Sequence, residues 1–202
     1  MRLVLKDRVF EIAKATLDAY ILDPHWSRKY DPHGYAGLSW ALTVEAKEAD
    51  FDDEIWEPRI YHEDLRLPVR RWIDVAGQTI TFDPDTDEGA GTLYVFEHAP
   101  ISRGTLRFLE RDGSRFRFEW EGLGDVFWDE SYSEDVPFTI HGWATFTGVV
   151  VRGSEHDDDA SIRARLAEYL DPDDFVQHPL QAGPPYDDGV RSAQAIFTPV
   201  ER

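Results

Sequence analysis

The sequence contains no cysteine and no long apolar run, and each absence excludes a class of structure. Without cysteine there are no disulfides and no thiolate metal sites, so the core alone has to stabilise the fold. No stretch approaches the roughly 20 apolar residues of a membrane helix. Charges at Arg2, Lys6 and Asp7 interrupt the apolar run that a signal peptide requires. We therefore predict a cytoplasmic protein that makes no contact with membranes.

Basic residues are also scarce. The chain has 21 Lys and Arg against 40 Asp and Glu, a formal net charge of −19. Such a field repels nucleic acid and anionic membrane, and it accelerates encounter with basic partners. Acidic chains that are poor in aromatics are disordered, but 7 Trp, 8 Tyr and 12 Phe indicate a packed interior. The composition predicts a folded protein that does not bind nucleic acid and gives no indication of its oligomeric state.

What the chain does contain is a series of short strand patterns separated by turns. In residues 38–48, Leu38, Trp40, Leu42, Val44 and Ala46 alternate with more polar residues, the period of a strand with one buried face. Strands do not alternate with long helices, which argues against an α/β fold. We predict a mainly β fold, an antiparallel β-sandwich or open barrel, with one or two peripheral helices.

The length of 202 residues fits one domain, and we treat residues 1–202 as a single β-rich domain. A helix is predicted to begin at Asp158 or Asp159 and to end before Pro172. We expect residues 153–202 to be this helix plus an irregular C-terminal segment packed on the domain. For residues 3–22 the pattern leaves two alternatives open, an amphipathic helix or a hairpin about Lys6-Asp7-Arg8.

Two hairpins can be assigned a register. In residues 71–82 a two-residue Ala76-Gly77 loop places Ile73 opposite Ile80. In residues 106–120 a three-residue loop, 111–113, with a left-handed Gly113 places Phe108 opposite Phe116, so that apolar residues share a face. One core is expected to contain the large side chains of the two most regular regions: Trp40, Leu42, Val44, Phe108, Phe116 and Phe118.

No catalytic or cofactor motif stands out. The acidic run 83–89 resembles a calcium loop in spacing, but its glycine comes one position late and Tyr94 stands where a bidentate Glu is needed, which favours a solvated loop. The seven histidines show no metal-ligand spacing, and there is neither a phosphate-binding loop nor a nucleophile motif. We predict no catalytic residue, no cofactor and no metal, and a non-enzymatic protein is favoured over an enzyme.

Residues 119–135 combine acid with aromatic side chains and contain no basic residue. Aromatic anchors with an acidic rim are typical of a surface that binds a basic protein. Trp120 is assigned to the core by the strand pattern, together with either Phe127 or Trp128. The predicted partner-binding residues are Glu119, Glu121, Asp125, Trp128, Asp129, Glu130, Tyr132, Glu134 and Asp135.

Three functions remain open. The first is an acidic, non-enzymatic binding or inhibitory module for a basic protein, since small acidic immunity proteins that neutralise bacterial toxins share this composition. The second is a carbohydrate-active or ligand-binding β-sandwich protein, in which rings stack on a ligand and carboxylates bind it or transfer protons. The third is a structural component of a larger assembly, in which the acid serves solubility.

Overall fold

The computed structural model describes residues 1–22, 37–51, 54–83, 91–127, 130, 132–185 and 189–201. The strands are β1 (Arg2–Leu5), β2 (Arg8–Ile21), β3 (Leu38–Ala46), β4 (Ala49–Phe51), β5 (Glu54–Trp56), β6 (Arg59–Leu65), β7 (Thr79–Phe82), β8 (Thr92–Tyr94), β9 (His98–Asp112), β10 (Arg115–Gly124), β11 (Val136–Ser154), β12 (Phe175–Gln177), β13 (Gln181–Pro185) and β14 (Arg191–Pro199). The helices are α2 (Asp159–Ala167) and the 3₁₀ helices η1 (Trp72–Val75) and η2 (Pro172–Asp174). The predicted mainly β fold with a peripheral helix is confirmed.

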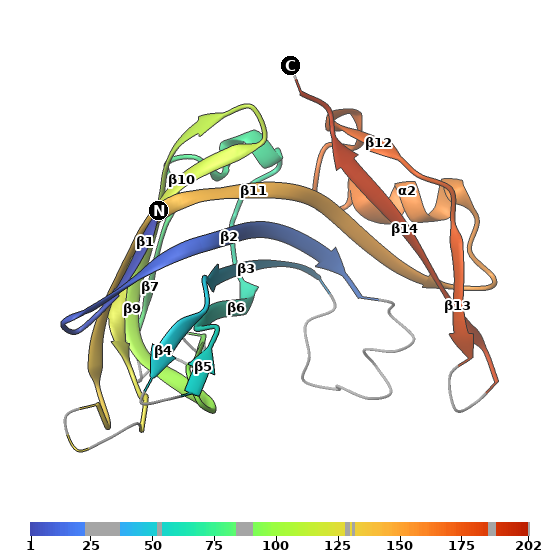
Figure 1. Ribbon diagram of the computed structural model, residues 1–202. Helices are drawn as coiled ribbons and strands as arrows, with labels where there is room; N and C mark the ends of the chain where they lie inside the picture. Colours follow the sequence, from blue (N-terminus) through green and yellow to red (C-terminus); the bar gives the residue numbers. More distant parts are fainter. Residues whose placement is uncertain are drawn as a thin grey trace.

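One large sheet curls round until its first two strands pair with β11, and β14 and β12 continue beyond that closure. The strands follow the order β1-β2-β3-β6-β8-β9-β10-β11-β14-β12, and β11 also pairs with β1 and β2. The first part of β11 runs antiparallel to β1, whereas a later part runs parallel to β2, and this is the one parallel pairing between described strands. Figure 1 shows β11, β2 and β3 arching side by side, with the separate β4–β5 hairpin below them. The closed path leaves one face of the sheet as the interior.

The predicted core is confirmed. Trp40, Leu42, Val44, Phe108, Phe116 and Phe118 are each at most 1% exposed. The ring of Phe146 lies 5.4 Å from that of Trp40 and 5.5 Å from that of Trp72, measured between centroids. These rings come from β3, β11 and η1, so the core joins strands that are distant in sequence.

The β9–β10 hairpin forms, but its turn differs from the predicted one. Asp112 pairs with Arg115, so the turn contains only Gly113 and Ser114. Gly113 has a φ of 60°, which confirms the predicted left-handed conformation. The predicted three-residue loop is wrong.

The register of this hairpin is corrected by a bulge. Phe116 pairs with Arg111, but Phe118 pairs with Phe108, so β9 holds one extra residue between these pairs. The bulge returns the apolar residues of both strands to the same face. The predicted pairing of Phe108 with Phe116 is therefore wrong: Phe108 pairs with Phe118, two residues further along β10. The prediction that Phe108 and Phe116 share a face is right.

Residues 71–82 do not form the predicted hairpin. Trp72 and Val75 are both buried, and a 3₁₀ turn over 72–75 directs this i,i+3 pair to the same side. β7 pairs instead with β9, where Ile80 lies opposite Leu106. The local sequence pattern did not predict this pairing, because the apolar partner of Ile80 is Leu106, in a strand more than twenty residues away.

The sequence left residues 3–22 open between a helix and a hairpin, and the structure shows a hairpin. β1 and β2 pair antiparallel about Lys6 and Asp7, and Leu3 lies opposite Phe10. The C-terminal segment expected to be irregular contains three strands, which corrects that expectation. β14 extends the main sheet along β11, and Ala193, Ala195 and Phe197 point into the core.

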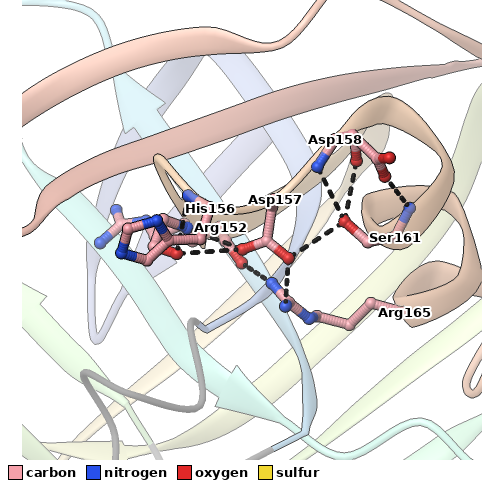
Figure 2. Close-up of polar contacts among 7 residues, drawn as sticks. Arg152, His156, Asp157, Asp158, Ser161 and Arg165 are labelled. Atoms are coloured by element: carbon pink, nitrogen blue, oxygen red, sulfur yellow. Dashed lines mark hydrogen bonds and ion pairs between the residues drawn. The ribbon is translucent and has the colours of Figure 1, made fainter.

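Helix α2 begins as predicted, at the Asp158 cap. The Asp158 carboxylate accepts a hydrogen bond from the backbone N–H of Ser161, whose hydroxyl accepts one from the N–H of Asp158. Figure 2 shows the neighbouring Asp157 between Ser161 and Arg165, with its Oδ1 3.0 Å from an Arg165 nitrogen. Ile162 and Leu166 on the opposite side of the helix are fully buried. Within the described ranges, no helix has the length and apolar content needed to cross a bilayer.

Candidate functional site

A hollow of about 630 Å³ opens on the outer face of the sheet, beside the β4–β5 hairpin. We call it the aromatic groove. It is lined by Thr43, Ile55, Trp56, Glu57, Arg59, Tyr61, Glu63, Tyr94 and His98. A volume of this size falls within the range of small-molecule sites.

Strand alternation and register place these side chains together. On β6, Arg59, Tyr61 and Glu63 point outward, whereas Ile60 and His62 are buried. Thr43 of β3 pairs with Tyr61, Arg59 pairs with Tyr94 of β8, and Tyr94 pairs with His98 of β9. The groove floor is therefore two rows of cross-strand neighbours, and Trp56 is added from β5.

The rings of the groove contact one another. The centroid of Tyr94 lies 4.7 Å from that of His98 and 6.5 Å from that of Trp56. The hydroxyl of Tyr61 is hydrogen-bonded to Nδ1 of His98 at 2.9 Å. Trp56 also packs on Phe96 at 4.9 Å, in an edge-to-face arrangement. These contacts hold four aromatic side chains in fixed positions around one opening.

The charges of the groove do not balance. Arg59 lies between two carboxylates, with nitrogen–oxygen distances of 3.5 Å to Glu57 and 3.9 Å to Glu45. Glu63 is exposed, and no other residue in the described part of the chain forms an ion pair with its carboxylate. Glu63 thus contributes a negative charge that no described residue of the groove neutralises.

More acid lies next to Glu63. The Tyr20 hydroxyl donates hydrogen bonds to the carbonyl oxygen of Glu63 and to Oδ1 of Asp64, both at 2.8 Å. Burial, the bond to Asp64 and the charges of Asp64 and Glu63 raise the pKa of Tyr20 to about 12. Removal from water, and then the charge of Glu63, raise the pKa of Asp18 above its ordinary value. Burial is the largest cause of both shifts, and the negative charge of Glu63 adds to each.

The acidic segment 119–135 proves to be less available than the sequence suggested. Oε1 of Glu121 lies 2.8 Å from Arg107, and Oε1 of Glu119 lies 3.4 Å from Nδ1 of His141. Both carboxylates are on the outer face of β10, where neighbouring strands supply basic partners. The arginine-rich stretch 103–117 therefore partly neutralises this acid across the sheet.

Other residues of the segment build its own loop. Asp125 accepts a hydrogen bond from the backbone N–H of Asp135, whose carboxylate accepts one from the hydroxyl of Ser102. Tyr132 is 6% exposed and its hydroxyl donates to Asp7, so its ring is not a surface anchor. Lys6 lies 5.1 Å from the centroid of the same ring.

The remaining residues of the segment divide into exposed ones and ones outside the described part. Glu130 and Glu134 are exposed, whereas Trp128 and Asp129 lie outside the described residues, as does most of the acidic run 83–89. Phe127 is 49% exposed and has a φ of 54°, so it is not the core residue that the sequence proposed as one of two. Val126 is buried there instead.

A second hollow, of about 760 Å³, lies over the pair Gly104 and Gly122 of β9 and β10. Its rim carries Arg103 and Glu121, and Glu121 is already paired with Arg107. Phe82 and Phe138 line it but are almost fully buried. Asp83 also lines it. Because its two rings are almost fully buried, this hollow offers less aromatic surface to a ligand than the aromatic groove does.

The pattern of the sequence does not predict the aromatic groove. The alternation in residues 59–63 does place Tyr61 on the face opposite Ile60, which is a usable signal for one ring. Tyr94 and His98 reach the groove only through pairing of β6, β8 and β9, whereas Trp56 is placed by the separate β4–β5 hairpin. No family model, curated protein or solved structure matches the chain. The site itself therefore carries the functional argument.

Proposed function

We propose that the protein is a binding protein for a small organic ligand, held in the aromatic groove. The observation that carries the proposal is the set of four rings, those of Trp56, Tyr61, Tyr94 and His98, around one opening of about 630 Å³. Half-buried aromatic rings beside carboxylates and an arginine are the usual lining of a site that combines apolar contact with a few oriented polar groups.

The charges favour binding over hydrolysis. Glycoside hydrolysis requires two carboxyl groups, one on each side of the bond that is broken. In the groove Glu57 is occupied by Arg59, which leaves Glu63 as the one lining carboxylate without a basic partner among the described residues. This supports the ligand-binding form of the function rather than the carbohydrate-active enzyme.

A screen of uncharged, cationic and anionic small molecules by thermal shift tests the proposal. A ligand present at 100 times its dissociation constant stabilises the folded state by about 2.7 kcal/mol, enough to raise the melting temperature measurably. We expect Trp56→Ala to abolish the shift produced by the best compounds. The matched control is Trp143→Ala, because Trp143 lies on β11 outside the groove and contacts Arg115. A screen without stabilising compounds, or hits that Trp56→Ala leaves unchanged, contradicts the proposal.

A basic protein partner docking on residues 119–135 is a second proposal. The observation in its favour is that Phe127, 49% exposed, stands in the same loop as the exposed acids Glu130 and Glu134. Complementary charge mainly accelerates association. We expect Glu130→Lys combined with Glu134→Lys to slow association with a co-purified basic partner, and Phe127→Ala to speed dissociation. An acidic partner, or unchanged rates, contradicts this second proposal.

A further inference from the structure

We propose that the ligand of the aromatic groove is an organic cation with an alkylated ammonium group, bound against the rings of Trp56, Tyr61 and Tyr94 with Glu63 as its counter-charge. The inference rests on the proposed function of the groove and names the class of its ligand. Three observations carry it: the charge balance of the lining, the number of half-buried rings in it, and the sign of the surrounding charge.

The charge balance excludes an anion and favours a cation. Among the described residues that line the groove, Arg59 is the one Lys or Arg, and Glu57 and Glu45 already neutralise it from two sides. An anionic ligand would have to displace one of these carboxylates and would also face Glu63. A cation leaves the Arg59 contacts intact and pairs with Glu63, whose carboxylate has no basic partner within the described ranges.

The rings supply the second interaction that an alkylated ammonium requires. A cation over an aromatic face gains from the negative charge of the π-system, and Trp and Tyr do this better than aliphatic side chains. Trp56 and Tyr94 are 6.5 Å apart at an angle of 65°. Tyr61 is fixed through its hydrogen bond to His98. The methyl groups of an ammonium can pack on these rings while its charge remains close to Glu63.

The residues around the groove also carry negative charge. Asp64 is the next residue after Glu63, and its carboxylate accepts a hydrogen bond from the Tyr20 hydroxyl, which also contacts the backbone carbonyl oxygen of Glu63. The raised pKa of Tyr20 reflects these two charges after burial. The whole protein carries −19. This field increases the local concentration of cations and speeds their arrival at the groove.

Choline and 3,3-dimethylbutan-1-ol form the decisive pair of probes, since the second has nearly the shape of the first with carbon in place of the charged nitrogen. Titration calorimetry on the full chain measures both, with tetramethylammonium and methyl β-glucoside alongside. We expect choline and tetramethylammonium to bind, and choline to bind at least tenfold more tightly than its neutral isostere. Raising the salt concentration is expected to weaken binding of the cations alone.

Variants separate the roles of charge and rings. Glu63→Gln keeps the size of the side chain and is expected to weaken choline at least tenfold, whereas Glu134→Gln, an exposed acid outside the groove, is expected to have no effect. Trp56→Ala is expected to weaken choline and its isostere alike. Glu63 is exposed, so a normal thermal melt is expected for Glu63→Gln and confirms that the loss is local.

The outcomes distinguish the two levels of the proposal. If methyl β-glucoside or another neutral compound binds in a manner that depends on Trp56, and neither ammonium compound binds, the cation inference is overturned and the groove stands as a ligand site. If choline binds but Glu63→Gln leaves its affinity unchanged, the role of Glu63 is overturned. If no probe of any charge binds in a manner that depends on Trp56, both the inference and the proposed function fail.

Discussion

At the scale of single residues, two glycines show how much depends on what surrounds a backbone position. Gly113 has a φ of 60°, and an added Cβ would meet nothing closer than 3.6 Å, a carboxylate oxygen of Glu201. Gly148 has a φ of 125°, and a Cβ there would lie 2.2 Å from the backbone oxygen of Phe197. The first position needs glycine for its conformation alone. The second needs it also because β14 passes directly against β11.

These surroundings predict different costs for the same substitution. We expect Gly113→Ala to lower the free energy of unfolding by about 1 kcal/mol, the cost of a left-handed alanine. Gly148→Ala is expected to cost about 3 kcal/mol or more, because backbone atoms have to move as well. Urea unfolding of the two variants measures both values. Equal losses would mean that the close approach of β14 at Gly148 does not occur.

At the scale of elements, polar contacts hold the junction between one element and the next. Asp157 stands between β11 and α2, and its Oδ2 accepts the backbone N–H of Ser154 while its Oδ1 accepts from Ser161 and Arg165 (Figure 2). Burial alone would raise the pKa of Asp157, but these bonds outweigh it and hold the pKa below its ordinary value of 3.8. The ionised carboxylate therefore stabilises the junction.

A lowered pKa in the folded state predicts a specific pH dependence. The stabilisation is fully present above pH 3.8 and is lost as the pH falls through the lower, folded-state pKa. We expect Asp157→Asn to cost about 1–3 kcal/mol at pH 7, since hydrogen bonds to a buried charge are lost. The gap between variant and wild type should close in strong acid. Urea unfolding across pH measures this, with Glu155→Gln, an exposed acid of the same loop, as the control. A gap independent of pH would contradict the assigned role.

The elements also show where the local sequence pattern no longer predicts the structure. The predicted β9–β10 hairpin was correct in its strands and in Gly113 but wrong in its loop, because a bulge in β9 restores the same face as a longer loop would. The predicted 71–82 hairpin failed because β7 pairs with β9 rather than with its sequence neighbour. In residues 106–120 the alternation of apolar residues was read correctly, whereas in residues 71–82 a 3₁₀ turn replaces the predicted strand alternation. In both cases the pairing itself could not be read from the local pattern.

At the scale of the whole molecule, the buried core stabilises the fold, whereas repulsion among the excess negative charges destabilises it. The single core cluster extends from Leu3 to Phe197, so most of the described strands contribute to one interior. Around it the chain carries −19, and such an excess of one sign disfavours the compact state. Some of the acid is paired locally, as between Glu121 and Arg107, but the total remains unbalanced.

Salt is therefore expected to stabilise the protein. Raising NaCl from 0.1 to 1 M shortens the Debye length from about 10 to about 3 Å, which screens repulsion between exposed acids. We expect the melting temperature to rise by several degrees. A triple variant with Glu48, Glu134 and Glu155 replaced by Lys carries −13, since each change adds two charges to −19. It is expected to gain less from salt, and an equal gain would contradict the electrostatic explanation.

The sequence by itself determined the local features of this protein: the alternation that buries Trp40 and Phe118, the Asp158 cap and the left-handed Gly113. These depend on the period of a strand or on the few residues around one turn. Tertiary structure alone decided which strands pair, including the closure of the sheet through β11 and the pairing of β6, β8 and β9. The aromatic groove belongs to that second group. Trp56 and Tyr61 precede Tyr94 and His98 by more than thirty residues. Long-range strand pairing, which no local pattern encodes, brings the two pairs together.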